Sequence, residues 1–333
     1  MKTSKKVLGI RTFGTVIIPL LAFVITSLIC KGNGIALFES YGNYNAFFRA
    51  TATVMLTTFA LSINLYSGRF DFSIGAISLL SSVFSASIAI NMGLPVWAML
   101  VLSIFTGLVL GVISGGIYVI TKLPPIIVSL GVALLYEGAA FALTDGYGVS
   151  FVSNTELTSF TGVSKYIGVI VIALILMIII FDHTKFGYEY RALLSGQEVA
   201  VNMGIKEIPN TLICYGIAGA LMGVVGFISA TNTGTIQMSL NFGSISVMFT
   251  AFLPMFIGSF ISRFSNDKLG YLLGAISVSF TSLMYARLKM DSSVQQIVTA
   301  LILVVFLIYL NNENKIMELK KLKMLVAERN ETP

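Results

Sequence analysis

Uncharged runs long enough to cross a lipid bilayer take up most of this 333-residue chain. A membrane-spanning helix needs about 20 mostly apolar residues, and the stretches between charged side chains reach or exceed that scale repeatedly. These stretches are residues 12–30, 50–68, 72–121, 123–144 with Glu137 inside it, 166–181, 208–262, 269–286 and 292–312. Charged residues make up only 11% of the chain, against about 25% in soluble domains. The chain is therefore expected to be an all-α, polytopic membrane protein.

Two of these runs are too long for one crossing, so each is expected to fold back. The run 72–121 contains Gly93 and Pro95, which favour a turn. The run 208–262 contains a polar, uncharged segment from Thr231 to Ser244. Counting each of the two long runs as two crossings gives ten spans. We expect them to form a single transmembrane domain, residues 1–333. We expect spans at about 12–30, 47–66, 72–91, 95–121, 124–144, 166–181, 210–229, 245–261, 269–286 and 293–311, and a tail at 312–333.

The distribution of Lys and Arg predicts the orientation in the membrane. With the N-terminus inside, sixteen of these residues lie in cytoplasmic segments and five lie outside. This positive-inside bias predicts that both termini and the loop 182–209 face the cytoplasm. The net charge of +6 then reflects topology and attraction to anionic membrane lipid, so no nucleic-acid partner is expected.

The loop 182–209 is the longest polar stretch, and it is expected to contain a short helix. Ser195-Gly196-Gln197-Glu198 has the form of a capping box, which predicts a helix that begins at Ser195. Val199, Ala200 and Met203 would form its apolar side, and Gly204 would end it after about two turns. Such a helix is too short to be stable alone. It is expected either to be bound by another protein or to lie on the lipid surface.

Two acidic residues stand out near the predicted spans. Asp71 lies between Gly68 and Gly75, where it is expected to cap the third span, with substrate contact as the alternative. Glu137 lies about 16 Å into the fifth span, where a charge costs about 2.5–3.5 kcal/mol. We therefore expect a neutral carboxyl hydrogen-bonded to Tyr, Ser or Asn side chains, with a place in a transport path as the alternative.

Glycines recur at helical spacing in the fourth and seventh spans. Small residues three or four positions apart allow helix backbones to approach closely, so these residues predict dense helix packing. They are Gly107, Gly111, Gly115, Gly216, Gly219, Gly223 and Gly226.

The sequence also excludes several kinds of chemistry. It contains no G-x-x-x-x-G-K-[ST] phosphate loop, no cluster of metal ligands and a single His, so no catalytic residue or cofactor is expected. An ion-driven carrier usually places several ionisable groups in its spans, and this chain offers one candidate. Energy is expected to come from a cytoplasmic partner.

Three segments carry a resemblance to a known family. Gly68 to Gly75 resembles G-G-I-D-L-S-V-G, and Lys122 to Gly131 resembles K-x-P-P-F-I-x-T-L-G. Phe186-Gly187, followed by Ala192, Gly196, Ala200 and Gly204-Ile205, resembles F-G-x-x-x-x-A-x-G-x-N-x-x-A-A-x-x-x-G-I. These segments are similar to those of permease subunits of bacterial ribose- and galactoside-type ABC importers, whose relatives carry sugars, nucleosides or autoinducer-2. The chain departs from the family at Arg69, which replaces Gly, at Gln197, which replaces Asn, and at Glu137, where many members carry Arg.

The resemblance implies a bacterial inner-membrane permease, and it implies that Ser195 to Ile205 dock on a separate ATPase. The implied coupling residues are Phe186, Gly187, Arg191, Ser195, Gly196, Gln197, Glu198, Val199, Ala200, Met203, Gly204 and Ile205. It also implies an external solute-binding protein and a second permease, identical or different.

The expected cargo is a neutral hydroxylated solute, because the outer connection Thr231 to Asn241 carries hydroxyls and amides but no charge. The alternative is that these hydroxyl and amide groups only interact with water in a loop, or that they contact the solute-binding protein. Candidate path residues are Asn64, Asp71, Ser73, Glu137, Asn232 and Gln237. Two other functions stay open at this stage, an ion-coupled carrier that uses Glu137 and a membrane scaffold without transport.

Overall fold

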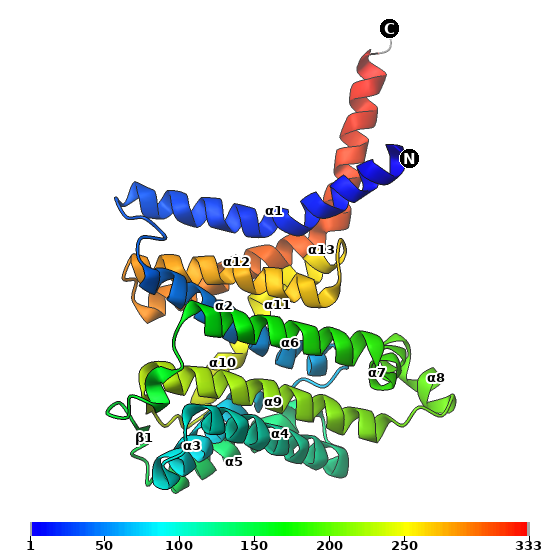
Figure 1. Ribbon diagram of the computed structural model, residues 1–333. Helices are drawn as coiled ribbons and strands as arrows, with labels where there is room; N and C mark the ends of the chain where they lie inside the picture. Colours follow the sequence, from blue (N-terminus) through cyan, green and yellow to red (C-terminus); the bar gives the residue numbers. More distant parts are fainter. Residues whose placement is uncertain (1, 332–333) are drawn as a thin grey trace. The chain divides into compact units, whose positions relative to one another are not determined.

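The computed structural model describes residues 2–331, with side chains over residues 14–312, and is helical almost throughout (Figure 1). Contacts divide the chain into two units, Met1–Arg287 and Leu288–Pro333. Over the described residues, ten helices are long and apolar enough to cross a membrane, which confirms the expected all-α class and number of spans. The continuous ones are α1 (Lys2–Gly32), α2 (Tyr41–Tyr66), α3 (Ile74–Met92), α4 (Val96–Thr121), α5 (Pro125–Leu143), α6 (Val163–His183), α9 (Glu207–Thr233), α12 (Asp267–Arg287) and α13 (Ser292–Glu331).

The eighth span is broken, whereas the sequence predicted one continuous helix at 245–261. It consists of η2 (Gly243–Ile245), α10 (Ser246–Phe249) and α11 (Phe252–Ser262), with Thr250 and Ala251 between the two α-helices. Pro254 lies in the first turn of α11, where its missing N–H removes no bond within the helix. The break therefore falls in the turn before that proline.

Two short strands connect loops at one end of the bundle. β1 (Val149–Ser150) follows α5, and β2 (Thr235–Ile236) follows α9; they pair antiparallel, with Val149 opposite Ile236. η1 (Leu157–Ser159) lies between β1 and α6. The expected outer loop at Thr231 is thus partly helical and partly strand, because α9 continues to Thr233.

Helices α4 and α9 lie side by side (Figure 1) and cross at almost backbone contact. A Cβ added at Gly107 would lie 2.3 Å from the Gly219 carbonyl oxygen, and one at Gly219 would lie 2.2 Å from that of Gly107. Ser103 Oγ donates to the Gly223 carbonyl across the same crossing, at 2.8 Å. These distances confirm the packing role predicted for the glycines at this crossing.

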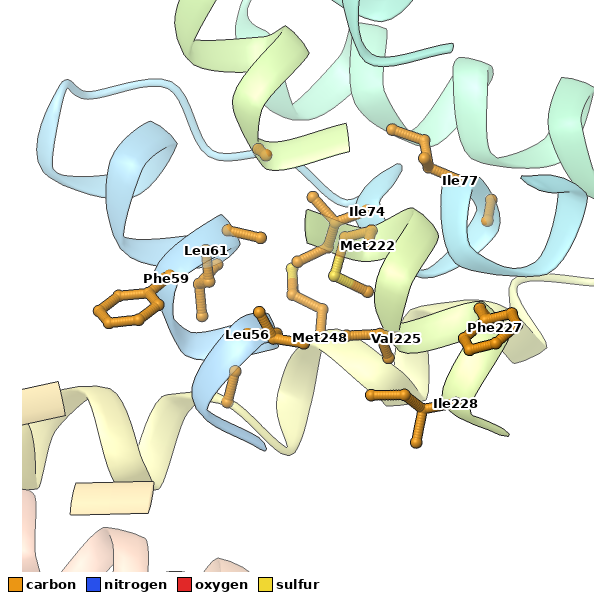
Figure 2. Packing of buried hydrophobic residues seen from close by; sticks show 14 of the residues in the cluster. Leu56, Phe59, Leu61, Ile74, Ile77, Met222, Val225, Phe227, Ile228 and Met248 are labelled. Atoms are coloured by element: carbon orange, nitrogen blue, oxygen red, sulfur yellow. The ribbon is translucent and has the colours of Figure 1, made fainter. Parts of the chain in front are cut away.

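Apolar side chains from several spans meet in the interior of the first unit. Figure 2 shows Ile74 of α3, Met222 of α9 and Met248 of α10 close together, with Leu56 of α2 beside Met248. The central spans α2, α3 and α9 are each 67% buried, whereas α4 and α6 are each 22% buried. The outer helices therefore present most of their apolar side chains outward, as lipid contact requires.

The second unit is built on α13, whose first part, Ser292–Asn312, is apolar enough to span a membrane. Its start is fixed by Gln295, whose backbone N–H donates to the Asp291 carbonyl at 3.0 Å and whose Nε2 donates to the Met290 carbonyl at 2.8 Å. The predicted tail from residue 312 onward continues the same helix to Glu331.

Candidate functional site

The loop predicted at 182–209 contains two short helices, α7 (Lys185–Ser195) and α8 (Gln197–Asn202). The predicted capping box is wrong. Ser195 is the last residue of α7, and its Oγ donates to the Arg191 carbonyl at 2.9 Å. Gly196 separates the helices, and α8 has no side-chain cap. The capping side chain of this segment is Thr184, whose Oγ1 accepts the Gly187 N–H at 3.2 Å.

Three apolar side chains in and just after helix α8 are exposed, those of Val199, Val201 and Met203. Val199 is 64% exposed and Met203 is 81% exposed, whereas Ala200 is buried. At its end Gly204 has φ of +92°, and the Ile205 N–H donates to the Ala200 carbonyl at 3.1 Å. Gln197 and Glu198 lie exposed in its first turn. The end predicted at Gly204 agrees with this geometry, although the start does not.

Aromatic packing holds α7 against the bundle. Phe186 and Tyr190 contact Phe181 at the end of α6. The Tyr190 hydroxyl donates to the Ile63 carbonyl of α2 at 2.9 Å. Burial raises the pKa of Tyr190, so this hydroxyl stays protonated and remains a donor. Gly187 is required by its neighbours, because a Cβ there would lie 2.1 Å from the Phe181 carbonyl oxygen.

Arg191 connects α7 to a carboxylate at the end of α6. Its Nη1 donates to the Phe181 carbonyl at 2.7 Å and to Asp182 Oδ1 at 3.0 Å. Asp182 also accepts hydrogen bonds from Lys268 at 2.6 Å and from Asn266 at 2.9 Å. These contacts could not be predicted from the sequence. Asn266 and Lys268 lie 84 and 86 positions after Asp182, and such separations give no spacing signal.

The path candidates Asn64, Asp71 and Ser73 lie together in a buried network between α2 and α3. Asp71 Oδ1 accepts the Ser73 N–H at 2.9 Å and the Ser73 hydroxyl at 2.6 Å, and Asn64 Nδ2 donates to Asp71 Oδ2 at 3.3 Å. Burial raises the pKa of Asp71, and the hydrogen bonds from Ser73 and Asn64 oppose that rise. The amide that Asp71 accepts belongs to Ser73, the residue before α3, so no amide of the helix itself is bonded by Asp71, and the capping role stays a prediction.

Arg69, the residue that departs from the family pattern, is buried beside this network. Its Nη2 lies 3.6 Å from Glu207 Oε1 at the start of α9. Its backbone N–H donates to the Asn64 carbonyl at 2.9 Å. The pair therefore ties the connection between α2 and α3 to α9, next to the coupling segment.

Glu137 binds backbone rather than the Tyr, Ser or Asn side chains that were expected. Its Oε1 accepts the Ser244 N–H at 2.8 Å, and its Oε2 accepts the Phe242 N–H at 3.0 Å. Both oxygens accept from donors that cannot accept in return, which fits a carboxylate better than the expected neutral acid. Glu137 is 1% exposed, and it anchors the start of the broken eighth span.

The remaining path candidates lie at the other end of α9. Asn232 is exposed and accepts a hydrogen bond from Arg49 of α2. Gln237 is exposed just after β2. Among the six candidates, hydrogen bonds join Asn64, Asp71 and Ser73 to one another, whereas Glu137 binds Ser244, which packs against Gly75 of α3. Over residues 14–312, no group of three or more His, Cys, Asp or Glu is arranged to hold a metal ion.

Comparison with known proteins gives consistent results. A family model described as "Branched-chain amino acid transport system / permease component" matches residues 45–310. The fructose import permease protein of Bifidobacterium longum is 25% identical, over 87% of this chain and 90% of its own. The ribose import permease protein of Haemophilus influenzae is 24% identical, over 80% and 84%. The autoinducer 2 import system permease protein of Photorhabdus luminescens is 23% identical, over 57% and 58%. No solved structure matches significantly.

Proposed function

Because this chain belongs to the family of permease components of the branched-chain amino acid transport type, we propose that it forms the translocation path of an importer for a neutral polar solute. The chain is a transmembrane permease of the bacterial inner membrane and not an enzyme. In such importers separate ATPase subunits hydrolyse ATP, and a solute-binding protein delivers the cargo. The ATPase and the binding protein are therefore its partners.

A neutral cargo is supported by how the buried carboxylates are engaged. Glu137 is held by two backbone amides, and Asp71 by Ser73 and Asn64. Both carboxylates are also buried, at 1% exposed for Glu137 and 2% for Asp71, which does not favour them as binding groups for the ammonium of an amino acid. The relatives named for fructose and ribose import handle hydroxylated, uncharged solutes. An ion-coupled carrier has no support from these relatives, all of which are named as import permeases.

Uptake into vesicles tests the cargo. Vesicles that contain the permease and its ATPase are supplied with the matching binding protein and labelled ribose, fructose, a nucleoside or leucine. Saturable, ATP-dependent import of a sugar or nucleoside supports the proposal. Import of leucine alone would reject it and favour the solute class in the family's description.

We further propose that α8 docks on the ATPase. The supporting observation is the exposure of Val199, Val201 and Met203 in and just after this helix. Exposed apolar side chains on a short helix that is joined to α7 suit a protein groove. The alternative is that these exposed side chains contact membrane lipid.

Replacing Val199 and Met203 with Asp is expected to release the ATPase while the permease stays folded. The matched control is Val152→Asp, because Val152 is 60% exposed but lies in the connection between α5 and α6. Co-purification measures the ATPase bound, and the melting temperature in detergent measures folding. Retention of the ATPase at normal stoichiometry after both Val199 and Met203 are replaced would contradict the docking role.

A second permease is proposed as the remaining protein partner, so that two such chains enclose the path. Exposed apolar side chains on α4 and α5 are available both for this contact and for membrane lipid; they include Phe105, Val112, Ile127, Leu134 and Phe141. Chemical cross-linking of the purified complex distinguishes two identical copies from two different permeases by mass.

A further inference from the structure

We propose that Asp182 is a positioning residue that transmits movement of the coupling segment, α7 and α8, to α12. This inference rests on the proposed docking of the ATPase on α8. It adds a route by which that docking acts on the bundle, through Asp182, Asn266 and Lys268, which are not among the implied coupling residues.

Asp182 is the point where three elements meet. It lies near the end of α6, and its Oδ1 accepts from Arg191 of α7 at 3.0 Å and from Lys268 of α12 at 2.6 Å. Its Oδ2 accepts from Asn266, just before α12, at 2.9 Å. The Lys268 side chain is only 12% exposed, so this ion pair is partly shielded from solvent and is stronger than a surface pair. One carboxylate thus holds both α7 and α12 to the end of α6.

A pocket separates α7 from α12 beside this junction. Its volume is about 310 Å³. The residues that line it include Tyr190 and Leu194 of α7, and Asp267, Lys268 and Tyr271 of α12. Ser259 and Ser262 of α11 also line it. Space in place of packed side chains allows α7 to move relative to α12, and the Asp182 contacts bridge that space at its edge.

Helix α12 can pass a displacement on because it is packed tightly against α11. A Cβ at Gly274 would lie 2.2 Å from the Pro254 carbonyl oxygen, and one at Gly270 would lie 2.5 Å from that of Gly258. Backbones this close move together, since packed interfaces shift between discrete arrangements rather than deforming continuously. Helix α11 is one half of the broken eighth span, whose other end Glu137 holds. Movement at α7 would therefore reach the break at Thr250.

Charge explains why the carboxylate is needed. Arg191 and Lys268 both donate to the same oxygen of Asp182, so a neutral side chain there leaves two cations facing each other. Arg191 would keep its bond to the Phe181 carbonyl, and α7 would keep its aromatic packing on α6. Loss of the charge is therefore expected to loosen α12 without unfolding α7.

The test follows the pocket as the ATPase works. Ser262→Cys introduces a cysteine that lines the pocket, and it is labelled with a maleimide in the full permease–ATPase complex with and without Mg-ATP. The native Cys30 and Cys214 are buried and contribute little labelling. The matched control is Glu189→Gln, which removes a carboxylate of α7 whose partner, Lys185, is 90% exposed.

We expect Mg-ATP to change the labelling rate at least about threefold in the parent and in Glu189→Gln. Asp182→Asn should abolish that change while the amount of bound ATPase and its hydrolysis rate stay the same, and Asp182→Glu should restore it. Lys268→Met removes only the α12 contact and should reproduce the loss, which covers the case that Asp182→Asn folds poorly.

Two results of the labelling would overturn the inference, an ATP-dependent change that survives in both Asp182→Asn and Lys268→Met, or no change in the parent complex. Failure of the proposed docking is recognised separately, because Val199→Asp with Met203→Asp would then keep the ATPase bound. A loss of ATPase binding in Asp182→Asn alone would also reject a transmitting role, since it would place Asp182 in the docking contact itself.

Discussion

Glu137 shows how a buried carboxylate is accommodated without a basic partner. The Phe242 and Ser244 N–H groups lie at the start of η2 and point at its two oxygens. Backbone amides at such a helix start carry partial positive charge, which stabilises an anion. Sequence reasoning placed Glu137 inside a span but could not find these partners, because backbone donors have no residue signature.

The Glu137→Gln variant is expected to be less stable, contrary to what a neutral carboxyl would predict. The Gln amide nitrogen would face a backbone N–H, so one buried donor loses its acceptor, at a cost of about 1–3 kcal/mol. Glu137→Ala would remove both acceptors and leave a cavity, so it should cost more. Thermal unfolding in detergent measures both variants, with Glu156→Gln, at a connecting position in the α5–α6 loop, as control. Equal stability of wild type and Glu137→Gln would contradict the carboxylate assignment.

Tyr190→Phe tests the contact that fixes α7 to α2. The variant leaves the ring packing in place but removes the donor to the Ile63 carbonyl, so we expect a loss of about 1 kcal/mol. Tyr188→Phe is the control, because Tyr188 lies on the same helix and is 59% exposed. Denaturation of the two variants in parallel gives the difference, and equal stabilities would show that the Tyr190 hydrogen bond contributes nothing.

Helices and their packing glycines were predictable because both leave regular spacing in the sequence. Uncharged runs of bilayer length located the spans, and the glycines of α4 and α9 predicted dense packing, although not that these two helices pack on each other. The break in the eighth span was missed because Met248 to Leu253 is as apolar as a continuous helix, and Pro254, which lies in the first turn of α11, was the local signal for a helix start. The start of α8 was also mispredicted. Ser195 satisfies its hydroxyl within α7, and this local bond competes with the capping role that the S-x-x-E spacing suggests.

Gly219→Ala is expected to separate α4 from α9. The new Cβ would lie 2.2 Å from the Gly107 carbonyl oxygen, and backbone cannot move aside as a flexible side chain can. We expect destabilisation of about 1–3 kcal/mol, as for overpacked cores. Gly116→Ala is the control on α4, because no atom lies within 4 Å of its added Cβ. Melting temperature and folded yield measure both variants, and equal values would contradict the close crossing.

At the scale of the whole molecule, the cytoplasmic position of both termini and of the coupling segment stays a prediction from Lys and Arg counts. The structure identifies exposed residues at which this predicted orientation can be checked. Tyr147, in the connection after α5, is 94% exposed, and Met203 is 81% exposed after α8. The predicted topology places these two residues on opposite sides of the membrane.

Cysteines introduced singly at Tyr147 and Met203 test this topology in intact cells. A membrane-impermeant maleimide should label Tyr147→Cys from outside, and it should label Met203→Cys only after the cells are opened. The buried native cysteines keep the background low, and unmodified protein serves as control. Labelling of Met203→Cys in intact cells would reverse the assigned orientation.

The contact between Glu137 and the eighth span also affects how the protein is made. The acceptor precedes its donors by 105 and 107 residues, and synthesis of that length takes about 5–20 s at the usual rate of elongation. During this interval α5 has emerged from the ribosome, but the amides that satisfy its carboxylate do not yet exist. Insertion of α5 must therefore wait for later spans or proceed with a protonated or hydrated Glu137. Nascent chains that end before Phe242 should accordingly hold α5 less firmly in the bilayer than chains that extend beyond Ser244.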